Sequence, residues 1–310
     1  MKKTFLIIIT TYILITAIII IVKDKDIINE INILTVKKAY SRIITPEEVI
    51  DIPIFFSEEN NFLIDKDNII DARIKDEHNE VEINIEKIEN AYQKTTYENI
   101  SYFMFYYQIK FNQFAINNLQ LNLENSYLEI IYQNETNLQL EIGDLNLLFT
   151  SINNHNHIDF TRMYSITNYE NNHNVVKAIY LELENLTGNN IYINSISLLN
   201  NKLFANTSEI KTVNFLPEYN MNFNSLLPEF NSIANEFKDN DCFIFKDKQN
   251  LIIPINHLNK WQFINRFPLI IDYSYNEENY QYIIDDYLFF SSLNELGNLN
   301  YEKSIYNYTY

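Results

Sequence analysis

The side chains best suited to bind a metal ion lie in one short stretch near the middle of the chain. His155, His157 and Asp159 occupy alternate positions there, and His173 follows further along. Alternate residues of an extended segment point to one side, and two imidazoles with a carboxylate form a ligand set that zinc or copper binds. The spacing makes His155, His157 and Asp159 candidate metal ligands. A solvated loop in an Asn-rich chain is the alternative interpretation of the same residues.

Two acidic stretches are weaker candidates for a site than the histidine segment: one resembles a calcium-binding loop, and the other is a pair of carboxylates that could suggest catalysis. Asp65-Lys-Asp-Asn68 begins like a calcium-binding loop, but Ile70 stands where the EF-hand turn requires glycine. Asp285 and Asp286 are neighbours along the chain. In a strand they would point to opposite faces, so they could not form an acid/base pair by themselves. We expect these positions to be solvated.

The glycines and the cysteine argue against several classes of enzyme. Gly143, Gly188 and Gly297 are far apart, so no glycine-rich loop can hold a phosphate and no Gly-x-Ser-x-Gly turn exists. Cys242 is predicted to be a small buried hydrophobic side chain rather than a nucleophile, even with His257 nearby in the sequence. We therefore predict no catalytic residue and no cofactor.

The composition limits the partners and the sources of stability. The formal net charge is −18 and no basic stripe occurs, which argues against nucleic acid as a partner because phosphate contacts need lysine and arginine. A single cysteine allows no intramolecular disulfide, so the fold must be stabilised by packing, as in bacterial surface proteins without disulfides.

An apolar stretch near the start decides where the rest of the chain lies. Phe5–Val22 contains no charged residue, and as a helix it is roughly as long as the hydrocarbon core of a bilayer is thick, about 30 Å. The stretch ends in Lys23-Asp24 without a small-residue cleavage site, and the only cysteine, Cys242, is far from the position that a lipoprotein signal requires. Phe5–Val22 is therefore predicted to be an uncleaved anchor in the lipid bilayer.

The basic residues beside this anchor do not settle its orientation by number. Lys2 and Lys3 lie before it, and Lys23 and Lys25 lie after it. We place the short N-terminus in the cytoplasm, because it resembles the start of an export signal and because the strongly acidic body would not adhere to an anionic inner leaflet. The bulk of the chain is then predicted to be extracytoplasmic, on a single-pass protein of the cell membrane.

Changes in pattern along the chain suggest six segments. They are the cytoplasmic tip and anchor 1–23, a juxtamembrane stalk 24–51, a first β domain 52–150, a linker 151–174, a second β domain 175–290 and a C-terminal tail 291–310. Within the stalk, Thr45-Pro-Glu-Glu48 has the residues of a helix start and predicts a short helix.

From Ile52 onward the hydrophobic period is two, which is typical of strands. Val81–Glu86 alternates strictly, as a strand with one wet face does. Ile100–Phe111 is rich in aromatic and β-branched residues and predicts a central strand covered on both faces; with one face exposed, Tyr102–Tyr107 could instead bind carbohydrate or peptide. Short links between the following strands favour antiparallel hairpins.

Asparagine replaces glycine in the predicted turns, because it is the non-glycine residue that best adopts positive φ. Pairs such as Asn60-Asn61 and Asn200-Asn201 mark these turns. The segments 127–147 and 179–198 share a strand, an Asn-x-Thr turn and two further strands, which suggests an internal repeat or a coincidence of biased composition. One helix is predicted where apolar residues from Leu226 to Phe237 recur at helical spacing.

The anchor, followed by Val176–Asn185 and Asn190–Leu198, resembles membrane-anchored extracytoplasmic proteins of A+T-rich bacteria that carry immunoglobulin-like domains. The resemblance implies a mainly β fold: one N-terminal transmembrane helix, then an antiparallel β-sandwich body of one large or two tandem domains, with a short helix in the second half. It transfers no functional residue.

These observations favour a non-enzymatic accessory or binding subunit of a bacterial membrane or envelope complex, in transport or secretion, with a membrane or envelope protein as its partner. The alternative is an envelope hydrolase or metal-dependent enzyme whose site is assembled from distant strands. A pocket holding several carboxylates would favour the enzyme, and an exposed sheet face or edge would favour partner binding.

Overall fold

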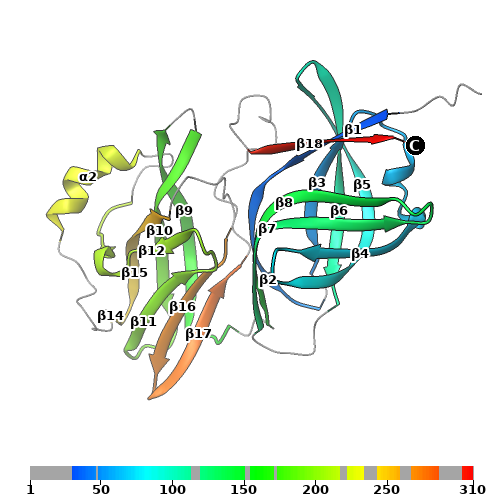
Figure 1. Ribbon diagram of the computed structural model, residues 1–310. Coiled ribbons are helices and arrows are strands. Elements are labelled where there is room, and N and C mark those ends of the chain that lie inside the picture. Colours follow the sequence, from blue (N-terminus) through cyan, green and yellow to red (C-terminus); the bar gives the residue numbers. More distant parts are fainter. Residues whose placement is uncertain are drawn as a thin grey trace, which may run out of the picture.

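A computed structural model describes residues 30–46, 48–112, 119–150, 154–170, 173–216, 222–233, 243–258, 267–285 and 302–309 (Figure 1). These residues are mainly β, with one α-helix and three short 3-10 helices among them. The predicted anchor, Phe5–Val22, lies outside the described residues. Among the residues inside them, no helix is long and apolar enough to cross a membrane.

Strands from the first half of the chain, together with β18 from its last residues, form a nine-stranded sheet with the order β18-β1-β3-β6-β5-β4-β7-β8-β2. This sheet and its core are called the first half below. Its strands are β1 (Glu30–Val36), β2 (Lys38–Ile44), β3 (Ile50–Phe56), β4 (Ile69–Lys75), β5 (Glu80–Tyr97), β6 (Ile100–Phe111), β7 (Leu119–Tyr132), β8 (Asn137–Phe149) and β18 (Lys303–Thr309). The 3-10 helices η1 (Phe62–Ile64) and η2 (Lys66–Asn68) lie between β3 and β4.

This sheet wraps around one core because its two ends share a single segment of chain. Only Lys37 separates β1 from β2. Yet β1 pairs with β18 and β3 near one end of the sheet, while β2 runs parallel to β8 at the other end. Side chains from β1 to β8 therefore meet in one hydrophobic cluster, with Phe56, Tyr107 and Phe149 among its largest members. The parallel β2–β8 pair makes the sheet mixed rather than purely antiparallel.

The second half is a β-sandwich (Figure 1). One sheet contains β9 (Ile158–Glu170), β10 (His173–Asn185), β12 (Leu203–Ala205), β13 (Lys211–Thr212) and β15 (Lys248–His257). The other contains β11 (Ile191–Leu198), β14 (Phe243–Phe245), β16 (Leu269–Tyr275) and β17 (Glu278–Ile284). Apolar side chains of both sheets meet between them, and η3 (Thr207–Glu209) precedes β13.

The helix α2 (Phe223–Ser232) covers the outer face of the first of these sheets. Leu226 and Phe230 are buried in a cluster with Tyr164, Tyr180 and other side chains of β9, β10 and β15. The sequence predicted this helix but placed it at the open end of a sheet. It begins three residues earlier than the apolar spacing indicated, where the Asn222 side chain accepts a hydrogen bond from the Asn224 N–H.

Three segments differ from the predicted organisation. The expected stalk, 24–51, contains β1, β2 and the start of β3, because side chains such as Ile33 and Ile44 are buried in the core of the first half. Around Thr45 the chain makes a turn rather than a helix, with the Glu48 N–H bonded to the Thr45 carbonyl at 3.0 Å. The expected linker, 151–174, contains β9, and the expected tail, 291–310, contains β18.

The two sequence segments that resemble each other have different structures. In the first, β7 and β8 form an antiparallel hairpin within one sheet. In the second, β10 and β11 lie in different sheets of the sandwich, so the link between them crosses from sheet to sheet. The similarity of the two segments therefore does not extend to the way their strands pair.

Two strand predictions are confirmed. In β5, Val81, Ile83 and Ile85 are buried and the side chains between them are exposed. In β6, which lies between β3 and β5, Phe105 and Tyr107 face the main core. Tyr102 and Met104 belong to a second cluster with residues of β1 and β3. The aromatic run of β6 is therefore used for packing on both faces.

Candidate functional site

A polar cleft of about 620 Å³ lies in the first half, at the turn between β4 and β5 and beside β7 and β8. Carboxylates and amides are the commonest groups in its lining. The described lining residues are Lys75, Asp76, Glu77, His78, Asn79, Asn122, Glu124, Asn125, Tyr127 and Gln139. A cavity of this volume is of the size that small ligands or a partner's side chains occupy. We refer to it below as the polar cleft.

Asp76 organises the turn at the base of the polar cleft. Its Oδ1 accepts hydrogen bonds from the backbone N–H groups of His78 (2.8 Å) and Asn79 (2.6 Å), and its Oδ2 accepts from the Glu124 N–H (3.2 Å). Burial favours a higher pKa for Asp76, but these donors outweigh it and lower the pKa below the ordinary value. Asp76 is therefore ionised at neutral pH and acts as a fixed acceptor.

The opposite wall is shaped by a bulge where β7 pairs with β8. The pairing register shifts between Leu123 and Ser126, and Asn125 adopts a φ of 49°. The Asn125 N–H donates to Asp144 Oδ1 at 2.8 Å, and the Ser126 hydroxyl donates to the Gly143 carbonyl at 2.5 Å. The bulge turns the side chains of this part of β7 toward both the cleft and the second half.

The Tyr127 side chain is fixed at the same wall. Its hydroxyl donates a hydrogen bond of 3.0 Å to Glu141, which also accepts from Ser304 of β18 and pairs with Lys37 at 2.9 Å. The hydrogen bond to Glu141 raises the pKa of Tyr127. The ring therefore presents a fixed aromatic surface to the cleft.

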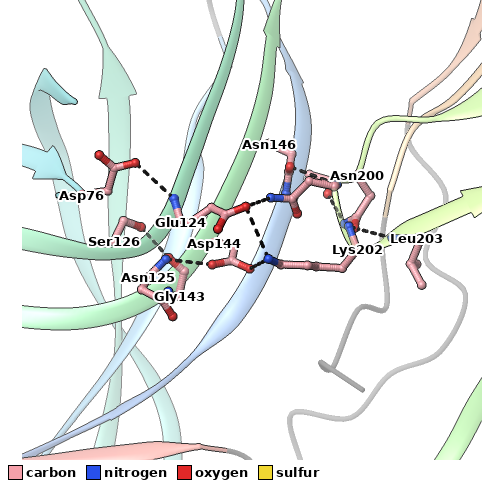
Figure 2. Close-up of polar contacts among 12 residues, drawn as sticks. Asp76, Glu124, Asn125, Ser126, Gly143, Asp144, Asn146, Asn200, Lys202 and Leu203 are labelled. Carbon is pink, nitrogen blue, oxygen red and sulfur yellow. Dashed lines mark hydrogen bonds and ion pairs between the residues drawn. The ribbon is translucent and has the colours of Figure 1, made fainter. Parts of the chain in front are cut away.

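A loop of the second half docks against this bulge (Figure 2). Asn200 Oδ1 accepts from the N–H groups of Lys202 (2.7 Å) and Leu203 (3.0 Å), which stabilises the turn that the Asn200-Asn201 pair predicted. Asn201 then reaches the first half twice: its N–H donates to Asn146 Oδ1 at 3.1 Å and its Nδ2 donates to Glu124 Oε1 at 3.1 Å.

Lys202 completes the contact between the two halves. Its Nζ lies 3.4 Å from Glu124 Oε1 and 3.8 Å from Asp144 Oδ2. The Asp144 side chain is 1% exposed, and its Oδ2 has no hydrogen-bond partner among the described residues, so its attraction to Lys202 at 3.8 Å is that of an ion pair alone. Beside this network, Ile43 and Leu148 of the first half pack with Leu199, Ile270 and Ile283 of the second. We refer to the network and this cluster together as the junction.

The cleft and the junction are continuous through Glu124, which lines the cleft and accepts hydrogen bonds from the second half. Glu124 is therefore shared between the cleft lining and the contact with the second half. Carboxylates accept hydrogen bonds and amides both accept and donate them, so the lining suits a polar ligand or partner surface.

The structure places the predicted metal ligands at one end of the sandwich. The His155 and His157 rings stack with centroids 5.6 Å apart, and His157 Nδ1 lies 3.2 Å from the Tyr273 hydroxyl. Asp159 instead accepts from the Tyr282 hydroxyl at 3.1 Å. The segment is not extended as expected, because the His157 N–H bonds to the His155 carbonyl.

Metal binding by His155, His157 and Asp159 stays a prediction. In the described ranges, no three His, Cys, Asp or Glu side chains gather in an arrangement that could hold a metal ion. The aromatic neighbours of His157 are Tyr273, Tyr275 and Tyr280, whose ring centroids lie 4.6 to 6.1 Å from its own.

The other singled-out residues have identifiable places. Asp65 caps a 3-10 helix, with its Oδ1 accepting from the Asp67 N–H at 3.0 Å. Asp285 Oδ1 lies 3.4 Å from the Ile43 N–H at the junction. Cys242 and Asp286 lie outside the described residues. His257 lines a second cavity, beside α2.

Sequence reasoning missed the polar cleft. The turn Asp76–Asn79 is polar like many others, and Asn122, Glu124 and Asn125 differ little from the remaining Asn and Glu residues of the chain. One signal was available: Gly143 stands inside a strand pattern, and an isolated glycine there indicates a bulge or a close backbone approach.

Comparison with known proteins gives no family. No protein-family model matches the chain, and no curated protein matches its sequence. A solved structure titled "BspA_C_WT" aligns with 82% of this chain and 99% of its own, at 8% sequence identity and a TM-score of 0.19.

Proposed function

We propose that this chain is a non-enzymatic, membrane-anchored extracytoplasmic protein that serves as an accessory or binding subunit of a bacterial membrane or envelope complex. Phe5–Val22 is the proposed bilayer anchor, with the N-terminus in the cytoplasm. The β body is the part that meets a partner, and we propose the polar cleft as the contact site. Transport and secretion complexes are the assemblies that such a subunit would serve.

The observation that carries the proposal is the state of the acidic groups around the polar cleft. Asp76 is a fixed, ionised acceptor of three backbone N–H groups. Glu124 is held by Asn201 and Lys202 of the second half. A general acid must carry a proton near neutral pH, which requires a raised pKa. Asp76 has the opposite shift, which does not suit a general acid, and its carboxylate holds the turn that shapes the cleft. We infer that the exposed polar side chains of the cleft meet a partner.

We further propose that the sandwich of the second half is immunoglobulin-like. The sandwich has two facing antiparallel sheets, and the link from β10 to β11 crosses from one sheet to the other. Both features support this assignment. Such sandwiches present their loops and edges to other molecules, which agrees with a role in binding.

A matched pair of variants tests the proposed contact site. Asn122 is exposed and lines the cleft, whereas Gln93 is exposed on the β5–β6 hairpin. The full chain is purified from solubilised membranes as wild type, as Asn122→Arg and as Gln93→Arg. We expect wild type and Gln93→Arg to retain the same stoichiometric envelope protein and Asn122→Arg to lose it. Equal retention by all three would refute the cleft as the contact site.

The alternative function is an envelope hydrolase, and one observation favours it: Asp76, Glu77 and Glu124 line the same cavity. This function predicts turnover of an envelope polymer that disappears in Asp76→Asn, Glu77→Gln or Glu124→Gln while binding persists. The proposed binding function predicts no turnover in any of these proteins.

A further inference from the structure

A second cavity, of about 540 Å³, lies between α2 and the outer face of the β9–β10–β15 sheet. It is separate from the polar cleft, which belongs to the first half. Phe223, Leu227 and Phe230 of α2 supply an apolar wall, and Lys177 of β10, Lys211 of β13 and His257 of β15 supply polar groups on the sheet side.

Lys211 is the unusual member of this lining. Lys211 is only 6% exposed to solvent. Its Nζ donates to the carbonyls of Phe230 (2.6 Å) and Ile233 (2.8 Å) at the C-terminal end of α2, and lies 4.4 Å from the centre of the Phe230 ring. These contacts use two of the three donors of an ammonium group.

The charge of Lys211 is only partly compensated. In the described part of the chain no carboxylate pairs with its Nζ, whereas buried charges in proteins are usually paired. The carbonyls and the dipole at the end of α2 provide about half a negative charge. A further anion in the cavity would complete the neutralisation and would use the third donor.

The remaining polar groups fit an anion of single charge. Lys177 adds a second positive charge, which it shares with Glu170 at 2.9 Å. The His257 ring lies with Nε2 2.9 Å from the Val176 carbonyl, and burial lowers its pKa, so it is neutral at pH 7. Among the lining residues that the structure describes, Glu209 is the single carboxylate.

We propose that this cavity binds a small organic monoanion with an apolar body, with the carboxylate at Lys211 Nζ and the apolar body against Phe223, Leu227 and Phe230. The two aromatic rings lie 5.9 Å apart between centroids and are tilted by 58°, so they offer a shaped surface rather than a flat one. The volume lies in the range of small-molecule sites.

The probe is 3-phenylpropanoate, with the neutral 3-phenylpropanol as its matched analogue. Binding to the full chain in a non-ionic detergent is measured by ligand-detected NMR and by calorimetry. We expect the carboxylate to bind at least about tenfold more tightly than the alcohol, since a charge-assisted hydrogen bond is lost in the alcohol. Equal affinity for the two probes, or binding of neither, would overturn the proposal.

Three variants locate the bound anion. Lys211→Met should weaken 3-phenylpropanoate binding at least about tenfold, and Lys87→Met, at an exposed lysine of the first half, should leave it unchanged. Because Lys211→Met also removes the contacts to the end of α2, Leu227→Trp provides a second test: it fills the cavity and keeps Lys211. Unchanged binding in Leu227→Trp, or in a folded Lys211→Met, would contradict the site.

Discussion

At Gly143 a hydrogen atom in place of a side chain allows β2 to lie against β8. A Cβ atom at this position would lie 2.1 Å from the carbonyl oxygen of Lys38 and 2.5 Å from the backbone nitrogen of Lys38. The φ of Gly143 is +102°. Both atoms belong to the backbone, so neither can move aside without disturbing the strand pair. Gly188 has a positive φ of 73° but no heavy atom within 4 Å of the corresponding position.

These two glycines form a matched pair for mutation. Gly143→Ala should lower the free energy of unfolding by at least about 3 kcal/mol, because backbone strain adds to a backbone clash. Gly188→Ala should cost about 1 kcal/mol, from the positive φ alone. Urea unfolding of both variants measures the difference, and equal costs would show that β2 does not approach β8 as closely as described.

Glu129 is a second residue whose surroundings determine its chemistry. It is 6% exposed and pairs with Lys75 at 2.9 Å and with Arg73 at 3.2 Å. Burial acts to raise the pKa of Glu129, but the hydrogen bond from Lys75 and those from Asn137 and Gln139 outweigh it and lower the pKa. The folded protein therefore binds a proton at this site less readily than the unfolded chain does.

The lowered pKa of Glu129 predicts a loss of stability in acid. The stabilisation is complete above the unfolded pKa of about 4.3 and is lost as the pH falls through the lower folded value. The melting temperature should therefore fall between pH 6 and pH 3. Glu129→Gln should reduce stability at pH 6 by roughly 2 kcal/mol and show a shallower fall with pH. A pH profile identical to that of wild type would contradict this role.

At the scale of elements, β18 shows how a distant segment completes the first half. β18 pairs with β1 along seven residue pairs, from Glu30 with Thr309 to Val36 with Lys303. The Tyr306 hydroxyl accepts from the Glu141 N–H at 2.8 Å, which ties β18 to β8 as well. Without β18, the edge of β1 that faces away from β3 would have no strand partner.

Removal of residues 302–310 tests this contribution. We expect the backbone amides of β1 to exchange with solvent faster by at least about tenfold, because their strand partner is lost. The amides of β10, in the second half, serve as the internal control and should exchange at the wild-type rate. Unchanged protection of β1 would show that β18 does not stabilise this edge.

Local pattern predicted the strands better than it predicted the connections between them. Alternation in Val81–Glu86 and the aromatic run of Ile100–Phe111 identified β5 and β6 correctly, since each depends on burial of one or both faces of a strand. The strand pairings of β1, β2 and β18 depend on residues far away in the sequence, and nothing local distinguishes such segments from a stalk or a tail. The polar cleft depends on the same distant pairings.

At the scale of the whole molecule, the junction joins two β bodies into one unit. The nine-stranded sheet and the sandwich lie side by side (Figure 1), and the loop at Asn200–Lys202 connects them through Glu124 and Asp144. The Asp144 carboxylate is almost fully buried. Loss of its cationic neighbour would leave a buried charge unpaired.

Lys202→Met should therefore loosen the contact between the halves. We expect a loss of about 2 kcal/mol and a broadened or divided thermal transition in calorimetry. In the double variant Lys202→Met/Asp144→Asn, the Asp144→Asn change should restore part of the lost stability, because it removes the unpaired charge. Lys87→Met, at an exposed pair with Glu89, should change stability by less than about 0.5 kcal/mol. If the double variant is less stable than Lys202→Met, the ion-pair interpretation fails.

The proposed location of the body follows from the anchor. Extraction of native membranes at alkaline pH should leave the full chain in the pellet, and protease added to intact spheroplasts should digest residues beyond Lys23. Release by alkali would contradict the anchor, and full protection from protease would contradict an extracytoplasmic body.

Site-specific photo-crosslinking in living cells can show whether the polar cleft contacts an envelope or membrane protein. A benzoylphenylalanine at Asn122 lies in the polar cleft, and one at Tyr192, a 40% exposed residue of β11, provides the control. We expect a crosslink to one envelope or membrane protein from position 122 and none to that protein from position 192. No crosslink from position 122, or the same product from both positions, would contradict it.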